Sequence, residues 1–471
     1  MHVGIVGGGI SGLYSALMLR RQGITVTLFE ATDRLGGRIY TYHFSPLSLG
    51  EDPYFEAGAM RIPCTSTHRS VFGLIEDLNR HSHDDMKLQL IPYIMEHENN
   101  MAFVSGKKRR ANDVSLAAEL GLPEKYCGRS AQDLLRIVIE PWVTLLRDNF
   151  EAGFENVLQY DEWSFRQYLH LVAQWPHEVI DFVEMMTSQT NQYNLSFIEV
   201  ILQYLDFNTK EWVTIKGGMS RLIDAVASLV GVHNIHTNAP VKGIHTSPHG
   251  KVKLFIGGIS PKAMIFDSVI LAIPLSSLNN MLERPRWSFS KEQAISRTYY
   301  EPLYKMGLHF RSRFWEHSAQ PCFGGQSTTD LRVRWVIYPS NDLGSNGSGV
   351  LLIYSWMTDA ARWSAMQFED RVELALHELG ILFAGEDEAL DVTQEFIEAF
   401  DISWSSHSST GGCMYLPGQL SRFSVEAGRP EGNIYFAGEH LSRHHAWIAG
   451  AIDSASKTVK EMLLKSISSK L

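Results

Sequence analysis

One arginine occurs among small and apolar residues, where a cation has little to bind. Residues 56–63 read EAGAMRIP, so Arg61 follows Ala59 and Met60 and is followed closely by Pro63. Charged side chains are rarely buried without a partner. A guanidinium presents a fixed fork of donors that matches a carboxylate with two parallel hydrogen bonds. We therefore expect Arg61 to bind an anion, either a carboxylate ligand or an acidic residue of the protein itself.

A glycine-rich turn near the start of the chain offers a second kind of chemistry. Residues 2–6 (HVGIV) have the pattern of a buried strand, residues 7–12 read GGGISG, and residues 13–21 have helical composition. In this context G-x-G-x-x-G turns the chain, lets the backbone approach a pyrophosphate and packs helix against strand. The helix N-terminus favours the negative charge. The residues expected at this pyrophosphate site are Gly7, Gly9, Ile10, Ser11 and Gly12.

A second strand completes the dinucleotide unit. Residues 25–29 (TVTLF) form the next strand pattern and end at Glu30, eighteen residues beyond Gly12. An acid at this place is expected to accept hydrogen bonds from the adenosine ribose. The pattern fits NAD and FAD equally well. Residues 31–38 (ATDRLGGR) follow directly and add a further glycine turn with two arginines, Arg34 and Arg38.

Size and composition limit the classes of function. The chain has 471 residues, which predicts two or more domains, and its net charge of −10 argues against nucleic acid or an anionic membrane as partner. Residues 107–110 (KKRR) are expected at a solvated hairpin tip. The four cysteines are far apart and form no CxxC pair, so neither a disulfide framework nor a metal site is expected. The final tripeptide Ser469-Lys470-Leu471 is the address read by the peroxisomal import receptor and predicts a peroxisomal protein.

Several stretches resemble the flavin amine oxidase superfamily (the monoamine and polyamine oxidase fold) in the same order. They are residues 31–38, 213–222 (VTIKGGMSRL), 239–244 (APVKGI), 266–274 (FDSVILAIP) and 434–439 (IYFAGE). The resemblance spans nearly the whole chain and implies FAD as cofactor. The FAD contacts that it implies, beyond the five residues of the first turn, are Glu30, Ala31, Arg34, Gly37, Arg38, Gly58, Ala59, Met60, Arg61, Val241, Trp404, Cys413, Gly438, Glu439, Trp447 and Ile448.

The resemblance also implies an α/β fold with a discontinuous Rossmann-like FAD-binding domain. This domain is expected from residues 1–64, 210–285 and 421–471. Residues 65–209, rich in helical periodicity and aromatic residues, are expected to form a helical insert that lines a substrate funnel. Residues 286–420 carry strand-like runs such as 305–310, 332–338 and 350–356, and are expected to form a substrate-binding α+β domain with a mixed sheet.

Within the superfamily, EAGAMRIP is similar to the L-amino-acid oxidase branch, where the arginine clamps the substrate carboxylate. Tyr338, just before Pro339, resembles a tyrosine that also binds this carboxylate in the branch. Residues 444–455 resemble the segment before the last helix, which implies that the Ala446 carbonyl accepts from the substrate amine and that Trp447 flanks the substrate. Lys305 lies ten residues before Trp315, as does the superfamily lysine that holds a water at flavin N5 and assists reaction with oxygen.

Cys413 departs from the branch to which Arg61 points. Residues 411–413 (GGC) resemble the monoamine oxidase motif whose cysteine is bonded to FAD, and Trp404 stands seven residues before it. Amino-acid oxidases generally have no cysteine there, so non-covalent FAD is favoured and attachment through Cys413 remains open.

The function expected is oxidative deamination of an L-amino acid to a 2-oxo acid, ammonia and H₂O₂, by hydride transfer to flavin N5 with O₂ as acceptor. The alternatives are a peroxisomal polyamine or monoamine oxidase, a tailoring oxidase of an amino-acid-derived metabolite, and a flavin-binding protein without turnover. A homodimer is compatible with the sequence but is not specified by it.

Overall fold

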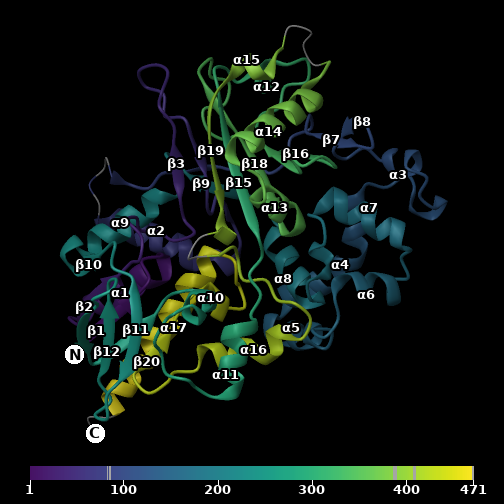
Figure 1. Ribbon diagram of the computed structural model, residues 1–471. Coiled ribbons are helices and arrows are strands. Elements are labelled where there is room, and N and C mark those ends of the chain that lie inside the picture. Colours follow the sequence, from purple (N-terminus) through teal and green to yellow (C-terminus); the bar gives the residue numbers. More distant parts are fainter. Residues whose placement is uncertain (82, 84–85, 386–389, 407–409, 469–471) are drawn as a thin grey trace.

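The computed structural model describes residues 1–81, 83, 86–385, 390–406 and 410–468. The targeting tripeptide 469–471 lies outside the described residues. A parallel sheet lies at the lower left of Figure 1, a group of helices at the right, and long antiparallel strands run upward between them. The expected α/β class is confirmed.

The parallel sheet is assembled from three distant parts of the chain. Its order is β10 (Ile235–His236), β2 (Thr25–Phe29), β1 (His2–Val6), β14 (Ser268–Leu271) and β20 (Ile434–Phe436), and every neighbouring pair is parallel. Helices α1 (Ile10–Arg21), α9 (Ser220–Val230) and α17 (Ile448–Ser468) pack together beside it. A parallel sheet needs apolar side chains on both faces, which explains the buried runs of β1 and β14.

The second large sheet has seven strands and is mixed. Only the β16–β7 pair is parallel. Its order is β19 (Phe396–Ser403), β15 (Leu303–Phe310), β18 (Gly349–Trp356), β17 (Trp335–Ile337), β16 (Gln326–Thr329), β7 (Met101–Val104) and β8 (Lys107–Arg110). The three strand-like runs identified in residues 286–420 thus become neighbouring strands.

The remaining elements connect and cover these two sheets. The small sheets are β3 (Thr41–His43) with β4 (Tyr54–Glu56), β5 (Ile62–Pro63) with β9 (Trp212–Ile215) and β6 (Leu90–Pro92), and β11 (Val241–Thr246) with β12 (Val252–Ile256) and β13 (Lys262–Phe266). The other α-helices are α2 (Arg69–His81), α3 (Leu116–Glu119), α4 (Ala131–Asp148), α5 (Phe150–Leu158), α6 (Phe165–Leu171), α7 (His177–Thr187), α8 (Phe197–Phe207), α10 (Leu275–Asn279), α11 (Phe289–Arg297), α12 (Phe314–His317), α13 (Met357–Ser364), α14 (Phe368–Phe383), α15 (Val392–Glu395) and α16 (Gln419–Gly428).

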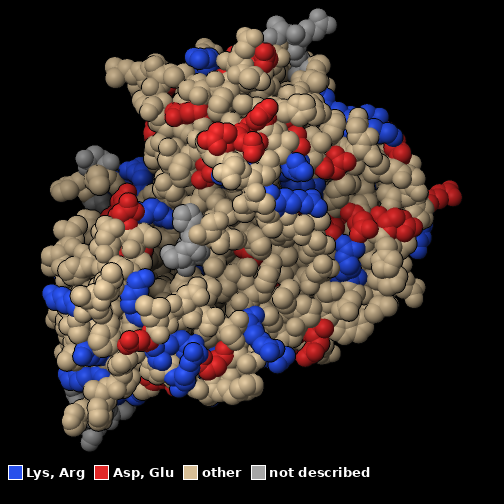
Figure 2. Space-filling view, in the orientation of Figure 1, with Lys and Arg blue, Asp and Glu red and all other residues tan. Residues whose placement is uncertain are grey.

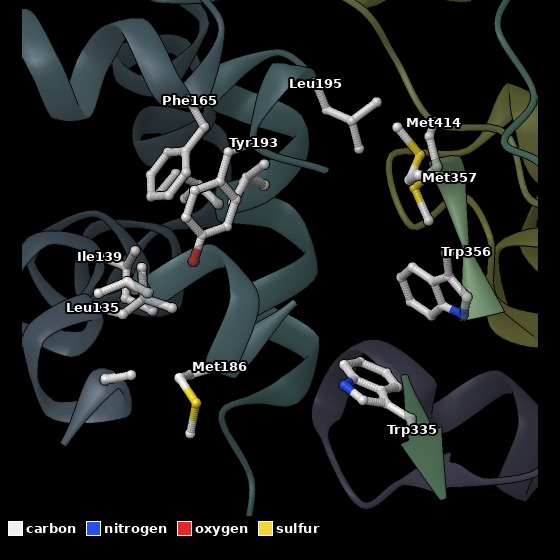
Figure 3. Packing of buried hydrophobic residues seen from close by; sticks show 14 of the residues in the cluster. Leu135, Ile139, Phe165, Met186, Tyr193, Leu195, Trp335, Trp356, Met357 and Met414 are labelled. Carbon is white, nitrogen blue, oxygen red and sulfur yellow. The ribbon is translucent and has the colours of Figure 1, made fainter. Parts of the chain in front are cut away.

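The helical segment and the mixed sheet share one hydrophobic core. Figure 3 shows Phe165 and Tyr193 of the helical segment on one side, and Trp335 and Trp356 of the sheet on the other. Each strand alternates its side chains between two faces. Trp335 and Ile337 of β17 therefore belong to this core, while Val336 belongs to a separate core on the opposite face.

Two expectations about residues 65–209 need correction. This segment is not wholly helical, because β6, β7 and β8 add strands to two of the sheets. The basic run 107–110 is strand β8 rather than a hairpin tip, since the turn falls at residues 105–106. Lys108 Nζ donates to the carbonyls of Leu382 and Ala384, which explains why this side chain is not free in solvent. The boundaries of the three domains stay a prediction.

Charges of both signs are scattered over the face drawn in Figure 2. Within the part of the chain that the structure describes, none of the helices has the length and apolar character needed to span a bilayer.

Candidate active site

A cavity of about 440 Å³ runs from the carboxyl ends of the parallel strands to one face of the mixed sheet. It brings together residues from the first turn, from the EAGAMRIP stretch, from β15 and β18, and from the start of α17. Most of the residues singled out in the sequence line it. They are Gly7, Gly9, Ile10, Ser11, Glu30, Ala31, Arg34, Gly37, Arg38, Gly58, Ala59, Met60, Arg61, Val241, Lys305, Trp404, Gly438, Glu439, Ala446, Trp447 and Ile448.

The turn between β1 and α1 is shaped to receive an anion. A Cβ on Gly12 would lie 2.0 Å from the Gly7 carbonyl oxygen, so Gly12 does not line the cavity but lets the helix pack against the turn. A Cβ on Gly9 would meet nothing closer than 3.9 Å, which leaves open space in front of the helix. No side chain caps α1. Its first N–H groups are therefore available to a phosphate group, and the residues fit a dinucleotide.

Glu30 stands at the end of β2, as the sequence predicts for a ribose contact. Its Oε2 accepts from the Gly8 N–H at 2.7 Å, and its Oε1 accepts from the Thr32 N–H at 2.9 Å. These bonds hold the carboxylate at the rim of the cavity. A carboxylate has about four lone-pair sites, so capacity is left for a ligand hydroxyl.

The two arginines of the second glycine turn have different environments. Arg34 donates to the backbone carbonyl of Gly37 at 2.7 Å and lies 4.2 Å from the ring centroid of Tyr40. Arg38 forms an ion pair with Glu439 at 2.6 Å. Although burial opposes ionisation, Arg38 holds the pKa of the Glu439 carboxyl below its usual value. Arg38 therefore joins the first part of the chain to the last.

Arg61 is buried without an acidic partner. Its residue is 7% exposed, and within the described ranges no carboxylate oxygen lies within 4 Å of its guanidinium. The rings of Tyr93, Phe207 and Trp212 surround it, with centroids 5.6, 5.2 and 5.5 Å from its Cζ. Burial raises the pKa of the Tyr93 hydroxyl, and the charge and hydrogen bond of Arg61 oppose that rise. Among the residues that the structure describes, the guanidinium thus faces the cavity without an acidic side chain within 4 Å.

Lys305 is a second buried cation of the cavity. It is 1% exposed, and its Nζ donates to the carbonyls of Glu56 at 3.0 Å and Gly58 at 2.6 Å. Burial lowers the pKa of its ammonium to about 7, against the opposing charge of Glu56. Trp404 Nε1 donates to the Ala57 carbonyl at 2.8 Å and so fixes the same stretch.

The expectation for Tyr338 is wrong in its placement. The residue lies one place beyond β17, its side chain is fully buried in the core on the opposite face, and its hydroxyl is 2.8 Å from Ser327 Oγ. It does not line the cavity. The tyrosine on the cavity face is Tyr354 of β18, which pairs with Lys305 and has its ring centroid 4.5 Å from the Lys305 Nζ. Strand alternation in the run VLLIYSW was the signal that could have found it.

The loop before α17 carries Ala446 and Trp447 into the cavity. Ala446 has φ +63, and its N–H donates to Glu439 Oε2 at 2.7 Å. The Trp447 ring lies 5.7 Å from Phe207 and 6.1 Å from Trp212, centroid to centroid. Since these two rings also flank Arg61, the structure brings together the guanidinium and the indole that the sequence separates by almost the whole chain.

Cys413 is buried and does not line the cavity. Its residue is 0% exposed, and burial raises the pKa of its thiol well above the usual value. Its neighbours Gly411, Gly412 and Met414 do line the cavity. No group of three His, Cys, Asp or Glu side chains suited to a metal ion occurs among the described residues.

The chain matches the family of flavin containing amine oxidoreductases over residues 10–463, and it belongs to that family. The family implies FAD as cofactor, which agrees with the anion site at α1. The residues that would hold it are those of the first turn, Glu30 and the start of α17.

Relatives within the family differ in what their names describe. The chain is 31% identical over 466 residues to an L-amino-acid oxidase of Siganus canaliculatus, covering 96% of this chain and 84% of that protein. It is 31% identical over 503 residues to a Dictyostelium discoideum protein with the provisional name of bifunctional amine oxidase, covering 98% of this chain but only 46% of that protein. A putrescine oxidase bound to putrescine has the same fold, with a TM-score of 0.76 at 19% identity, covering 98% of this chain and 99% of that one.

Proposed function

We propose that this protein is an FAD-dependent oxidase of L-amino acids. The reaction consumes an amino acid, O₂ and water, and releases a 2-oxo acid, ammonia and H₂O₂. The single observation that carries the proposal is the Arg61 guanidinium, which is buried beside the cavity and has no acidic partner in the described part of the chain. An amine without a carboxylate would leave this cation uncompensated, whereas an amino acid would pair with it.

The residues of the cavity have distinct parts in this reaction. Arg61 binds the substrate carboxylate, with the Tyr93 and Tyr354 hydroxyls as neighbouring hydrogen-bond groups. The Ala446 carbonyl accepts from the amine, and the Trp447 ring restricts its position. This two-point attachment fixes the Cα–H, so that positioning supplies much of the rate enhancement.

The aromatic walls contribute by excluding water. Desolvation disfavours the charged form of an amine, and a neutral amine is the form that can lose hydride from its Cα. When bound, FAD supplies the hydride acceptor and passes the electrons on to O₂. We favour a non-covalent cofactor because Cys413 does not line the cavity.

The test is H₂O₂ production by the purified yellow protein with the twenty L-amino acids, D-alanine, benzylamine and spermine. Turnover of L-amino acids that is lost in Arg61→Met supports the proposal. Turnover of benzylamine or spermine alone would contradict it and favour a monoamine or polyamine oxidase. Turnover of none of these compounds would also contradict it and favour a tailoring oxidase with a specialised substrate.

We also propose that the protein is imported into peroxisomes through Ser469-Lys470-Leu471, an address that suits an oxidase producing H₂O₂. A fluorescent fusion at the N-terminus tests this, because it leaves the tripeptide free. Co-localisation with catalase that is lost on deleting the three residues is the expected result. A diffuse signal from the intact fusion would contradict import.

A further inference from the structure

Glu301 is a buried acid of the cavity wall that the proposed reaction does not use. The residue is 2% exposed and lines the cavity just before β15. Its Oε2 is buried and has no hydrogen-bond partner among the residues that the structure describes. An unsatisfied buried oxygen is unfavourable, so a ligand group that hydrogen-bonds to it would bind more tightly.

Two other acids near Glu301, Glu199 and Glu439, already have basic partners within the protein. Glu199 lies 2.6 Å from His445 Nε2, and Glu439 is paired with Arg38. Both carboxylates, after burial itself, help to raise the pKa of Glu301 well above its usual value. Within the described ranges no basic nitrogen lies within 4 Å of Glu301. A cation entering the cavity would therefore find its partner in Glu301.

The position of Glu301 is rigid. Its N–H donates to the Gly412 carbonyl at 3.1 Å, and a Cβ on Gly411 would lie 2.0 Å from the Glu301 carbonyl oxygen. Pro302 follows, which favours extended backbone at Glu301. These contacts anchor the Glu301 backbone on the cavity wall, from which its side chain extends.

Glu301 and Arg61 both line the cavity near the start of the strand β15, which covers Leu303–Phe310. Arg61 follows Met60, whose Sδ is 3.6 Å from the Lys305 Nζ. Glu301 and Lys305 are four residues apart along a nearly extended chain, so their Cα atoms are separated by about 13 Å at ~3.3 Å per residue. The pKa of the Tyr354 hydroxyl is raised first by burial and then by Glu301, while Arg61 lowers it, so both charged groups act on this one cavity side chain.

Because Arg61 and Glu301 line the same cavity, a ligand that pairs with both needs a carboxylate at one end and a cation at the other. Fully extended lysine measures roughly 7 Å from its carboxylate carbon to Nζ. A hydrogen bond of about 3 Å at each end extends the reach of lysine to about 13 Å.

Resting on the proposed function, we infer that Glu301 binds the side-chain ammonium or guanidinium of a basic L-amino acid whose carboxylate is held by Arg61. The substrate class is then lysine, ornithine and arginine. Glu301 acts as a specificity-determining residue, because the ion pair forms only with a side chain that carries a cation.

The experiment compares L-lysine with L-norleucine, which has the same carbon chain without the terminal amine. The wild-type holoenzyme is expected to prefer lysine in kcat/KM by roughly 30-fold or more. Glu301→Gln should reduce this ratio at least tenfold, and Glu301→Leu should reverse it. The matched control is Glu378→Gln, a buried acid of α14 that bonds to the Val333 N–H and does not line the cavity, and it should leave the ratio unchanged.

Binding without turnover gives a second readout. 6-Aminohexanoate carries both charges but no α-amine, and hexanoate lacks the cation. Flavin absorbance should report tighter binding of 6-aminohexanoate than hexanoate in the wild type, and equal binding in Glu301→Gln. This measurement remains informative if a variant loses turnover.

Failure of this inference is distinguishable from failure of the proposed function. Equal turnover of lysine and norleucine, both lost in Arg61→Met, would overturn the role of Glu301 and leave the carboxylate clamp standing. An altered flavin spectrum in Glu301→Gln with an unchanged lysine-to-norleucine ratio would also overturn it. Oxidation only of amines without a carboxylate would remove the proposed function itself.

Discussion

Two buried arginines of this protein have opposite surroundings. Arg334 is 3% exposed, forms an ion pair with Asp359 at 3.3 Å and donates to the carbonyls of Met185 and Ser188. Arg61 is 7% exposed and has aromatic rings where Arg334 has oxygens. A guanidinium with a purely structural role finds its hydrogen-bond and ion-pair partners within the protein. A guanidinium that lies against a cavity and has no carboxylate within 4 Å among the described residues is available to bind a ligand.

Arg61→Met gives the strongest test of this contrast. Loss of one partner of a desolvated charged pair costs about 4 kcal/mol, or roughly 1000-fold in kcat/KM for an L-amino acid. The melting temperature should hardly change, because no protein carboxylate is left unpaired. Steady-state kinetics and thermal unfolding of the holoenzyme measure the two effects. A variant that keeps wild-type kcat/KM would remove the distinction between the two arginines.

Arg334→Met should show the reverse pattern. Its removal leaves Asp359 with only Arg362, at the surface, as cation, and breaking a buried pair costs about 3 kcal/mol of unfolding free energy. The kcat/KM of correctly folded holoenzyme should stay near the wild-type value, since Arg334 does not line the cavity. Denaturant unfolding measures the loss. Lost activity in a stable Arg334→Met protein would contradict the contrast.

The elements around these arginines differ in how far the sequence predicts them. The β1–α1–β2 unit follows from local signals, namely an apolar strand, glycines at fixed spacing and a terminal acid. The rings of Phe207 and Trp212 around Arg61 could not be predicted, because they approach from about 150 residues away and no local pattern encodes that contact. Glu301 gave no signal either, since a single acid between aromatic residues and a proline resembles a surface turn.

Tyr338 shows how a correct strand can give a wrong site residue. The run 332–338 does contain β17. The resemblance identified a tyrosine before a proline, but it did not indicate on which face of the sheet that side chain lies. One position along a strand moves a side chain to the opposite face. Ile337 therefore faces the shared core and Tyr338 the other. The tyrosine that lines the cavity, Tyr354, instead belongs to β18, the strand next to β17.

The buried lysines Lys291 and Lys305 show the same contrast as the two arginines, with smaller expected effects. Lys291 is paired with Glu431 at 3.4 Å, whereas Lys305 has only carbonyls and a thioether. A cation near reduced flavin stabilises the anions formed with O₂. Lys305→Met should slow reoxidation by roughly 10- to 100-fold and affect flavin reduction less, as stopped-flow absorbance would show. Lys291→Met is the control, expected to lower stability without altering reoxidation. Slower reduction alone in Lys305→Met would contradict the assignment.

The same lysine predicts a pH dependence. Burial lowers the pKa of Lys305 to about 7, so the group is charged below this pH and neutral above it. The reoxidation rate constant should fall as pH rises through about 7, and Lys305→Met should abolish that dependence. A rate that rises with pH in the wild type, or a dependence that survives in the variant, would exclude the ammonium as the responsible group.

Tyr354 and Tyr338 allow a comparison between a cavity residue and a core residue in which the expected effects are smaller. Tyr354→Phe removes a hydroxyl on the cavity face, and the loss of a hydrogen bond of about 1 kcal/mol predicts roughly a fivefold increase in KM. Tyr338→Phe removes the hydroxyl that contacts Ser327. It should cost a similar amount in unfolding free energy and leave KM unchanged. An increase in KM for Tyr338→Phe alone would restore the assignment made from the sequence.

The two buried cysteines, Cys413 and Cys322, allow the comparison with the smallest expected effect. Cys413 and Cys322 are both almost fully buried, but only Cys413 adjoins residues of the cavity. Its thiol is kept protonated by burial and by the charges of Glu439 and Glu199, and a thiolate is the nucleophilic form. Cys413→Ala and Cys322→Ala should therefore both release their flavin completely on acid denaturation, as should the wild type. Flavin that remains with the wild-type polypeptide but leaves Cys413→Ala would show that the thiol reaches the cofactor despite its burial.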